Sequence, residues 1–433
     1  MTEGIRKILG LLRANTCIAL TSLLFCVFVW IRFSGIRIWG DLQWDQVHTA
    51  WMSARILHDH EYPLQSMMVK GNSGIHIGPL YYYLVAIFYW MTNYDPVASP
   101  LLAASTGVLG FLILFWCVRK IHGDLTAFLS VFILTFSGAS ILADRVQWSP
   151  NLIPPISLLL FYNLYRVLQG KSKNLLWIGV LIGVSFHVHF IVILFIVILF
   201  IVMVLAAVPF FPRNKQTMLN AILAIIIVIA FLLPNGIYEF THPKNDAFGS
   251  VSSYASSNYH GFHARRFLQL TRDAFIDVEK ILPFRFIGRA IYLLPFLYMS
   301  FVWYSFRRRV SLTLSFLVGI WLLVPWVAFS VYSGEISDYY FSSFRYIAIM
   351  MCAYVLSSMI SKSFLSRVVA IVFLLYYVSH SWNIVVKSEN GNMSSTSEQV
   401  KQTVSEGKMI PYVEGSLKSY AYFMYTELTP IKK

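Results

Sequence analysis

Long apolar runs separated by short polar segments make up most of this chain. A transmembrane helix needs about 20 mainly apolar residues, or somewhat fewer where the span is short. On this criterion the pattern predicts eleven crossings, near residues 15–36, 98–118, 125–143, 150–168, 174–188, 190–211, 218–237, 289–306, 311–332, 339–361 and 364–386. The predicted fold class is an all-α polytopic membrane protein.

Two parts of this pattern need an argument from charge. The apolar stretch from Leu175 to Phe211 is too long for one helix and is basic at both flanks, so we expect two crossings that meet at His187-Val188-His189. The short apolar segment 78–93 could cross or lie along the membrane surface. If it crossed, the basic loops near residues 119–120 and 166–173 would move outside, against the tendency of Lys and Arg to stay inside. An interfacial helix is therefore favoured.

Composition and charge agree with this topology. The chain is 57% hydrophobic and only 12% charged, with a mean hydropathy of +0.64. With 78–93 at the interface, fifteen Lys and Arg and two acids lie inside, for a net charge of +13, and nineteen cations and eighteen acids lie outside, for +1. The excess of positive charge is thus a feature of topology, and no basic-aromatic module accompanies it that would indicate nucleic-acid binding.

The same topology leaves three outer segments, at residues 37–97, 238–288 and 387–433. We expect residues 1–386 to form one transmembrane module and residues 387–433 a short outer tail. The tail carries an aromatic patch that could rest on the membrane surface: Tyr420, Tyr422, Phe423 and Tyr425. The N-terminus is expected in the cytoplasm, with an uncleaved first span.

The first outer segment holds the strongest candidate chemistry. Asp41 and Asp45 are four residues apart, and neither has a Lys or Arg at a neutralising helical spacing. Apolar residues recur at three- and four-residue intervals after Asp45, which predicts a short amphipathic helix lying flat on the outer leaflet. Asp45 then falls at or just before its first turn, where it could be a catalytic carboxylate or simply a helix cap.

Other candidate groups give weaker signals. All four cysteines lie in apolar runs, so no disulfide or metal site is expected. Glu335 and Asp338 could bind an acceptor or a divalent cation, which is the one cofactor that outer acids could hold, or they could be solvated loop residues. His187 and His189 could bind substrate or could hydrogen-bond backbone carbonyls at the ends of two spans.

Several of these motifs, in order along the chain, resemble the GT-C superfamily of membrane glycosyltransferases. The branch concerned includes the protein mannosyltransferases of glycosyltransferase family 39 and the aminoarabinose transferase of lipid A. The similar segments are Asp45-Gln46 with the helix that follows, His76-Ile77-Gly78-Pro79-Leu80-Tyr81-Tyr82-Tyr83, Leu142-Ala143-Asp144-Arg145-Val146-Gln147-Trp148-Ser149-Pro150, Ser185-Phe186-His187-Val188-His189 and Phe344-Arg345-Tyr346. Many relatives have Asp-Glu where this chain has Asp45-Gln46, and a proline where it has Gly78.

The resemblance implies a GT-C bundle with interfacial helices in the first outer loop. It further implies transfer of a hexosyl or pentosyl group from a polyprenyl-phosphate donor to a lipid, glycan or protein acceptor, on the outer face of a bacterial inner membrane. In that family Asp45 would act as general base, with Asp41 as helper or substitute. The donor phosphate would be bound by cations from Arg145, Arg345, Arg265 and Arg266. The expected substrate-binding residues are His76, Tyr81, Tyr82, His187, His189, Asp144, Glu335 and Asp338.

Each role has a plainer alternative. Arg145 could pair locally with Asp144 or extend toward the interface, and Arg345 could pair with Asp338. At the level of function, a transporter or flippase of lipid-linked sugars would also need outer cations and aromatics. A polysaccharide polymerase or ligase would share the large outer loops. Transporters commonly show two related halves, which this sequence lacks.

Overall fold

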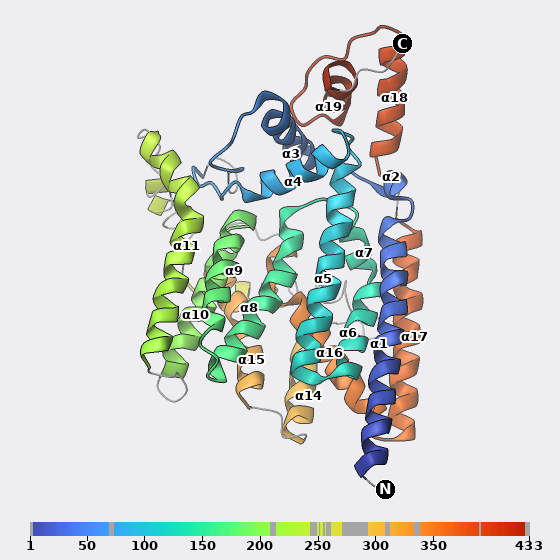
Figure 1. The fold of residues 1–433 in the computed structure, drawn as a ribbon, viewed down its shortest axis with the longest axis vertical. Helices are drawn as coiled ribbons and strands as arrows, with labels where there is room; N and C mark the ends of the chain where they lie inside the picture. Colours follow the sequence, from blue (N-terminus) through green and yellow to red (C-terminus); the bar gives the residue numbers. More distant parts are fainter. Residues whose placement is uncertain are drawn as a thin grey trace.

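The computed structural model describes residues 3–68, 73–207, 214–242, 249–250, 252–253, 256, 261–270, 293–307, 312–332, 338–388 and 391–428. Each of the eleven predicted crossings coincides with a helix or a pair of helices. These are α1 (Glu3–Phe33), α5 (Ala98–His122), α6 (Asp124–Phe136) with α7 (Gly138–Ala143), α8 (Ile153–Leu168), α9 (Asn174–Val188), α10 (Val192–Ala207), α11 (Lys215–Thr241), α14 (Leu293–Arg307), α15 (Leu312–Val331), α16 (Arg345–Ile360) and α17 (Phe364–Val386). They run side by side as one bundle, with the two termini at opposite ends (Figure 1).

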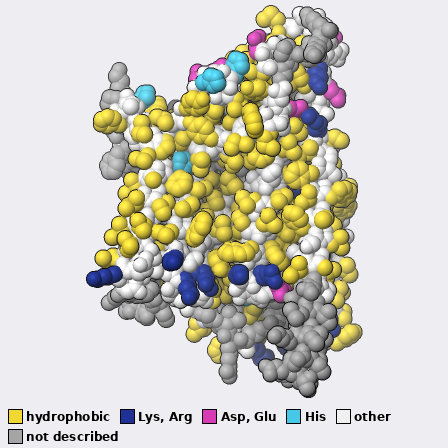
Figure 2. Space-filling view, viewed as in Figure 1, with side chains coloured by type: hydrophobic (Ala, Val, Ile, Leu, Met, Phe, Trp, Pro, Cys, Tyr) yellow, Lys and Arg dark blue, Asp and Glu magenta, His cyan; other side chains and the backbone are white. Residues whose placement is uncertain are grey.

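The helices identify a multi-pass membrane protein. Six of them are long and apolar enough to cross a membrane by length and composition, and several of the others are shorter apolar helices. The expected break in the long apolar stretch is present, since α9 ends at Val188 and α10 begins at Val192. Figure 2 shows a broad hydrophobic band, with Lys and Arg side chains along its lower edge and most of the visible acids and histidines at the opposite end.

The predicted first outer loop forms a layer of short helices on the bundle, the loop layer. It contains α2 (Ile36–Trp39), α3 (Trp44–Ala54), the π-helical turn η1 (Arg55–Asp59) and α4 (Leu80–Met91). The 12 residues of α4 cover about 18 Å, too short for a hydrocarbon core of about 30 Å. In Figure 1, α4 lies across the top end of the bundle beside α3. The segment expected along the interface is therefore a helix lying at the end of the bundle.

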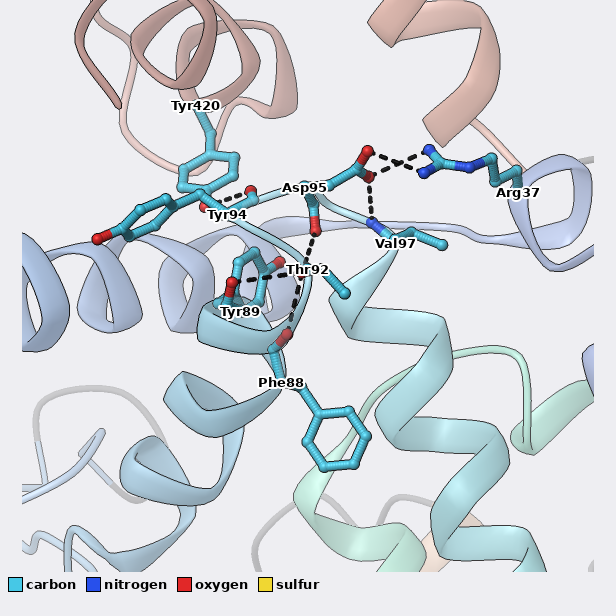
Figure 3. Close-up of polar contacts among 8 residues, drawn as sticks. All are labelled: Arg37, Phe88, Tyr89, Thr92, Tyr94, Asp95, Val97 and Tyr420. Carbon is cyan, nitrogen blue, oxygen red and sulfur yellow. Dashed lines mark hydrogen bonds and ion pairs between the residues drawn. The ribbon is translucent and has the colours of Figure 1, made fainter. Parts of the chain in front are cut away.

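A tight turn joins α4 to α5 and holds α2 in place. Asn93 and Tyr94 both have positive φ angles, of 53° and 64°. The Asp95 carboxylate then accepts the Val97 N–H at 2.8 Å and forms a two-pronged ion pair with the Arg37 guanidinium at 3.2 and 2.9 Å (Figure 3). One carboxylate thus fixes both the start of α5 and the position of α2.

The C-terminal tail folds back onto this loop. Its helices are α18 (Met393–Ser405), α19 (Leu417–Phe423) and the π-helical turn η5 (Met424–Leu428). The Asn392 side chain accepts the Leu42 N–H at 3.0 Å and donates to the Leu42 carbonyl at 2.8 Å. The Tyr420 hydroxyl donates to the Tyr94 carbonyl at 3.1 Å (Figure 3). Tyr420 is fully buried, and Tyr425 nearly so. The interpretation that the aromatic patch rests on the membrane is therefore wrong for these two residues, which pack inside the protein.

The bundle contains a buried ion pair between α1 and the end of α7. The Arg32 guanidinium of α1 donates to the Asp144 carboxylate at 3.0 Å and to the carbonyls of Leu134 and Thr135 at 2.9 and 2.6 Å. Its side chain is fully buried and lies 4.0 Å from the Phe28 ring centroid. Asp144 fits against α5 because residue 107 is glycine, where a Cβ would overlap the carboxylate. The pair ties the first span to the end of α7.

Candidate active site

A cavity of about 730 Å³ opens between the first outer loop and the end of the bundle. Its walls come from α3, the loop that precedes α4, the segments between α7 and α8 and between α9 and α10, and the 3-10 helix η4 (Asp338–Phe344). The polar side chains in its lining are Asp45, His48, Gln65, Ser66, His76, Tyr82, Ser149, His189, Tyr339 and Tyr340. A cavity with a few convergent polar groups among aromatic ones is typical of a small-ligand site.

Asp45 is half-buried in this cavity and lies in the first turn of α3. The alternative that Asp45 is the helix cap is wrong, because the cap residue is Gln43, whose N–H is accepted by the Gln46 side chain at 3.1 Å. Within the described part of the chain, the Asp45 carboxylate makes no hydrogen bond or ion pair. Its oxygens are therefore available to a ligand.

Asp41 does not share a helical face with Asp45, because α3 begins only at Trp44. Its carboxylate accepts a hydrogen bond from the Gln43 amide at 3.0 Å, and it does not line the cavity. The two carboxylates that the sequence suggested as a pair therefore occupy different surroundings. Only Asp45 faces the cavity.

His48 lies one turn after Asp45 and is part of a fixed aromatic group. Its ring stacks on Trp44 with the centroids 5.2 Å apart, and its Nε2 hydrogen-bonds the Tyr82 hydroxyl at 3.0 Å. Burial lowers the pKa of His48, while the carboxylates of Glu414 and Asp45 oppose that shift. Burial also raises the pKa of the Tyr82 hydroxyl to about 12. Both groups are thus neutral near pH 7, and His48 can accept a proton there.

His76 reaches the cavity from a short hairpin-like loop. The Ser66 N–H donates to the Ile77 carbonyl at 2.9 Å, and Met68 and His76 form an isolated antiparallel bridge. The Nδ1 of His76 lies 2.8 Å from the Ser66 carbonyl, which can only accept, so Nδ1 carries the proton. In the neutral ring Nε2 is then a free acceptor. The Asn235 amide, from α11, donates to the His76 carbonyl at 3.3 Å.

Tyr81 and His187 were expected to bind substrate, but neither lines the cavity. Tyr81 is buried in the loop layer, and its hydroxyl accepts from Gln147 at 2.9 Å. His187 is also buried; its Nε2 donates to the Phe231 carbonyl at 2.9 Å, and its Nδ1 accepts the Leu80 N–H at 3.3 Å. Both ring nitrogens are thus used by the backbone, which was the alternative considered for this histidine.

Gly78 gives a test of this arrangement. A Cβ at residue 78 would overlap the Nδ1 of His187, whose ring is held on its other side by Phe231. Gly78→Ala should therefore lower the free energy of unfolding in detergent by about 1–3 kcal/mol, as overpacking does elsewhere. The matched control is Gly236→Ala on α11, where nothing lies within 4 Å of the added carbon. Equal stabilities of the two variants would contradict the contact.

None of the four predicted phosphate-binding arginines lines the cavity. Arg145 is buried, with its guanidinium 4.2 Å from the Trp39 ring centroid and 3.3 Å from the Ser388 hydroxyl. Arg345 begins α16 and interacts electrostatically with Asp144. Arg265 is exposed. Arg266 donates to the Phe329 carbonyl at 3.4 Å, and the Phe329 ring lies 5.5 Å from that of Tyr340.

The remaining predicted site residues differ in whether they line the cavity. His189 lines the cavity, with its ring edge-on to Tyr339 at 5.3 Å. Asp144 pairs with Arg32 and lies outside the cavity lining. Glu335 falls outside the described residues, and Asp338 is described only as the first residue of η4. No group of three or more His, Cys, Asp and Glu within the described ranges could hold a metal ion.

Two important residues were missed at the level of sequence. His48 could have been found from its position three residues after Asp45 on the same helix. Gln147 had no such signal. Its carbonyl accepts from Gln46 at 2.8 Å, and its side chain contacts the hydroxyls of Thr49 and Tyr81 at 3.1 and 2.9 Å. This buried amide joins the segment after α7 to both α3 and α4, and it fixes the direction in which α3 presents Asp45.

Comparison with known proteins identifies the fold. No protein-family model matches the sequence, and no curated protein matches it. ArnT from Cupriavidus metallidurans, in a crystal structure with undecaprenyl phosphate, is similar with a TM-score of 0.60 and 13% identity, over 94% of this chain and 75% of that one. The archaeal oligosaccharyltransferase AglB from Archaeoglobus fulgidus, in complex with an inhibitory peptide and a dolichol-phosphate, has a TM-score of 0.54 and 13% identity, over 96% and 64%.

These similarities confirm the GT-C fold that the motifs suggested. A GT-C bundle is the fold of a class of membrane glycosyltransferases, and the present chain has that architecture over nearly its whole length. Another structure of the archaeal enzyme is a complex with zinc and sulfate. Among the residues that the structure describes here, no group of three or more His, Cys, Asp and Glu could hold a metal ion.

Proposed function

We propose that this protein transfers a sugar from a polyprenyl-phosphate donor to an acceptor hydroxyl or amide at the outer face of a bacterial inner membrane. The observation that carries the proposal is the Asp45 carboxylate, which faces a 730 Å³ cavity at the junction of the interfacial helices and the bundle. The fold shared with ArnT and AglB, whose structures contain undecaprenyl phosphate and a dolichol-phosphate, supports a lipid-linked donor.

In this proposal the chemistry is a single displacement. Asp45 takes the proton of the acceptor group as its oxygen or nitrogen attacks the anomeric carbon. The bond from that carbon to the phosphate oxygen breaks, and the polyprenyl phosphate leaves with the electron pair. The configuration at the anomeric carbon is therefore inverted. Arg266, which bonds the carbonyl of Phe329, and Arg345, at the start of α16, are the cations that would stabilise the charge on the leaving phosphate.

The orientation follows from the same charges that separate the two ends of the bundle. The N-terminal end carries the basic edge and the cavity end carries most of the acids in the view of Figure 2, which supports a cytoplasmic N-terminus and an outer cavity. Under this orientation the interfacial helices lie at the outer headgroup level. A lipid-linked phosphate would be bound at that depth.

The direct test is mass spectrometry of lipid that co-purifies with the protein, followed by a transfer assay with that lipid in detergent. We expect a polyprenyl-phosphate species and turnover of its sugar. A transporter or flippase would need a sealed compartment and would not consume the donor in micelles. Purified protein that neither binds a polyprenyl phosphate nor turns over a polyprenyl-phosphate sugar would refute the proposed reaction.

A further inference from the structure

A second cavity, of about 750 Å³, lies between the first outer loop and the C-terminal tail. One wall comes from α3 and η1, and the other comes from residues 412–427. Its lining combines aromatic side chains, from Trp51, Tyr412 and Phe423, with acidic ones, from Asp59, Glu414 and Glu427, and it also includes Arg55, His48 and His58. The proposed reaction assigns no role to these residues.

The tail wall of this second cavity is anchored to the first outer loop. The Asn392 side chain pairs with both backbone polar groups of Leu42, and the buried Tyr420 hydroxyl donates to the Tyr94 carbonyl at 3.1 Å (Figure 3). Gly415 has a φ of 71°, and a Cβ there would overlap the Trp44 ring. Trp51 packs against Phe423 with the ring centroids 4.8 Å apart. The second cavity is therefore built by contacts that hold both walls.

The two cavities are neighbours that share two residues, His48 and Met52. His48 interacts electrostatically with Asp45, which lines the first cavity, and with Glu414, which lines the second. Its ring is held between Trp44 and Tyr82. His48 is thus part of the wall that the two cavities share, on the same helix as Asp45.

The lining indicates the chemical class of the ligand. Flat aromatic faces pack well against the C–H face of a sugar ring, and carboxylates accept hydrogen bonds from hydroxyl or ammonium groups. Asp59 is bonded to His58 at 2.7 Å, whereas Glu414 and Glu427 have no ion pair in the described part of the chain. The lining holds three carboxylates and one guanidinium, that of Arg55, which lies 3.8 Å from Glu61. The excess of negative charge disfavours an anionic ligand, because like charges repel in a partly enclosed space.

We infer that the second cavity is the acceptor site and that it admits a neutral or amine-bearing glycan. This inference rests on the proposed function, since an acceptor is needed only if a sugar is transferred beside Asp45. The glycan would lie on Trp51 and Tyr412, and its reacting hydroxyl would extend past His48 to the Asp45 carboxylate, which takes the proton.

Binding to immobilised oligosaccharides tests this without any donor. In detergent, the purified full-length protein should bind immobilised oligosaccharides that are neutral or carry an amine. It should not bind those that carry a carboxylate. Tyr412→Ala should weaken binding about tenfold, while Glu414→Gln should allow carboxylate-bearing oligosaccharides to bind. Tyr412 is 67% exposed, so its loss should not unfold the protein. The matched control is Tyr62→Ala, which is 64% exposed, lines neither cavity and should bind like the natural protein.

The outcomes separate the acceptor site from the reaction. Absence of binding by every class of oligosaccharide, or equal weakening in the Tyr412 and Tyr62 variants, overturns the acceptor site. Turnover of the donor would leave the proposed reaction standing in that case. Glycan binding that depends on Tyr412, in a protein that never consumes a polyprenyl-phosphate sugar, would support the binding cavity and refute the reaction. In a transfer assay, Tyr412→Ala should raise the acceptor KM about tenfold with kcat unchanged.

Discussion

Asp45→Asn should reduce sugar transfer by about a thousandfold, within the range of about 10²–10⁴ that a positioned general base contributes. The amide has nearly the same shape as the carboxylate but cannot take the acceptor proton. Because Gln43 caps α3, the loss of charge at residue 45 should leave the helix and its cavity intact. The measurement is initial transfer rate in detergent, with insertion and thermal stability checked in parallel.

Two control variants test whether the loss of transfer is specific to Asp45. Asp41→Asn should transfer at close to the natural rate, because that carboxylate bonds Gln43 and lies outside the cavity lining. Glu61→Gln removes an exposed carboxylate of the same loop, one that only approaches Arg55 at 3.8 Å, and it serves as the matched control. Near-normal turnover in Asp45→Asn, or an equal loss in Asp41→Asn, would show that the base is wrongly assigned.

The bundle was predictable because a bilayer restricts what the chain can do. A crossing needs a minimum length of apolar residues, and loops carry their Lys and Arg on one side, so runs and charges together define the spans. The same reasoning located the break near His187 and the flat helix at 78–93. The amphipathic stripe after Asp45 likewise predicted α3, since a period of 3.6 residues needs no knowledge of its partners.

The details of the site depend on contacts between residues far apart in the chain, and these leave no local pattern. Arg32 and Asp144 are 112 residues apart, and Asn392 is 350 residues from Leu42. The tail could be placed on the membrane because tyrosine suits any boundary between apolar and polar surroundings. A lipid surface and the first outer loop both offer such a boundary. The sequence could not distinguish them.

Arg32→Met is the variant for which we expect the largest loss of stability. It removes the guanidinium that lies 3.0 Å from the Asp144 carboxylate and leaves that carboxylate, only 13% exposed inside the bundle, with the more weakly placed charge of Arg345. Removing one member of a buried pair costs about 3–5 kcal/mol, chiefly because the other charge is left without compensation. The measurement is the free energy of unfolding in mixed micelles. Arg32→Met combined with Asp144→Asn should recover part of the loss, since the buried carboxylate charge that Arg32 compensated is also removed.

The matched control is an arginine whose ion pair is exposed to solvent. Arg37 is 59% exposed and bonds Asp95 at the surface of the loop layer. Exposed pairs contribute at most about 1 kcal/mol, because solvent screens the charges and the side chains lose freedom when they pair. Arg37→Met should therefore cost much less than Arg32→Met. If the two variants were equally stable, or if the double variant were no better than Arg32→Met alone, the buried pair could not be what ties the first span to α7.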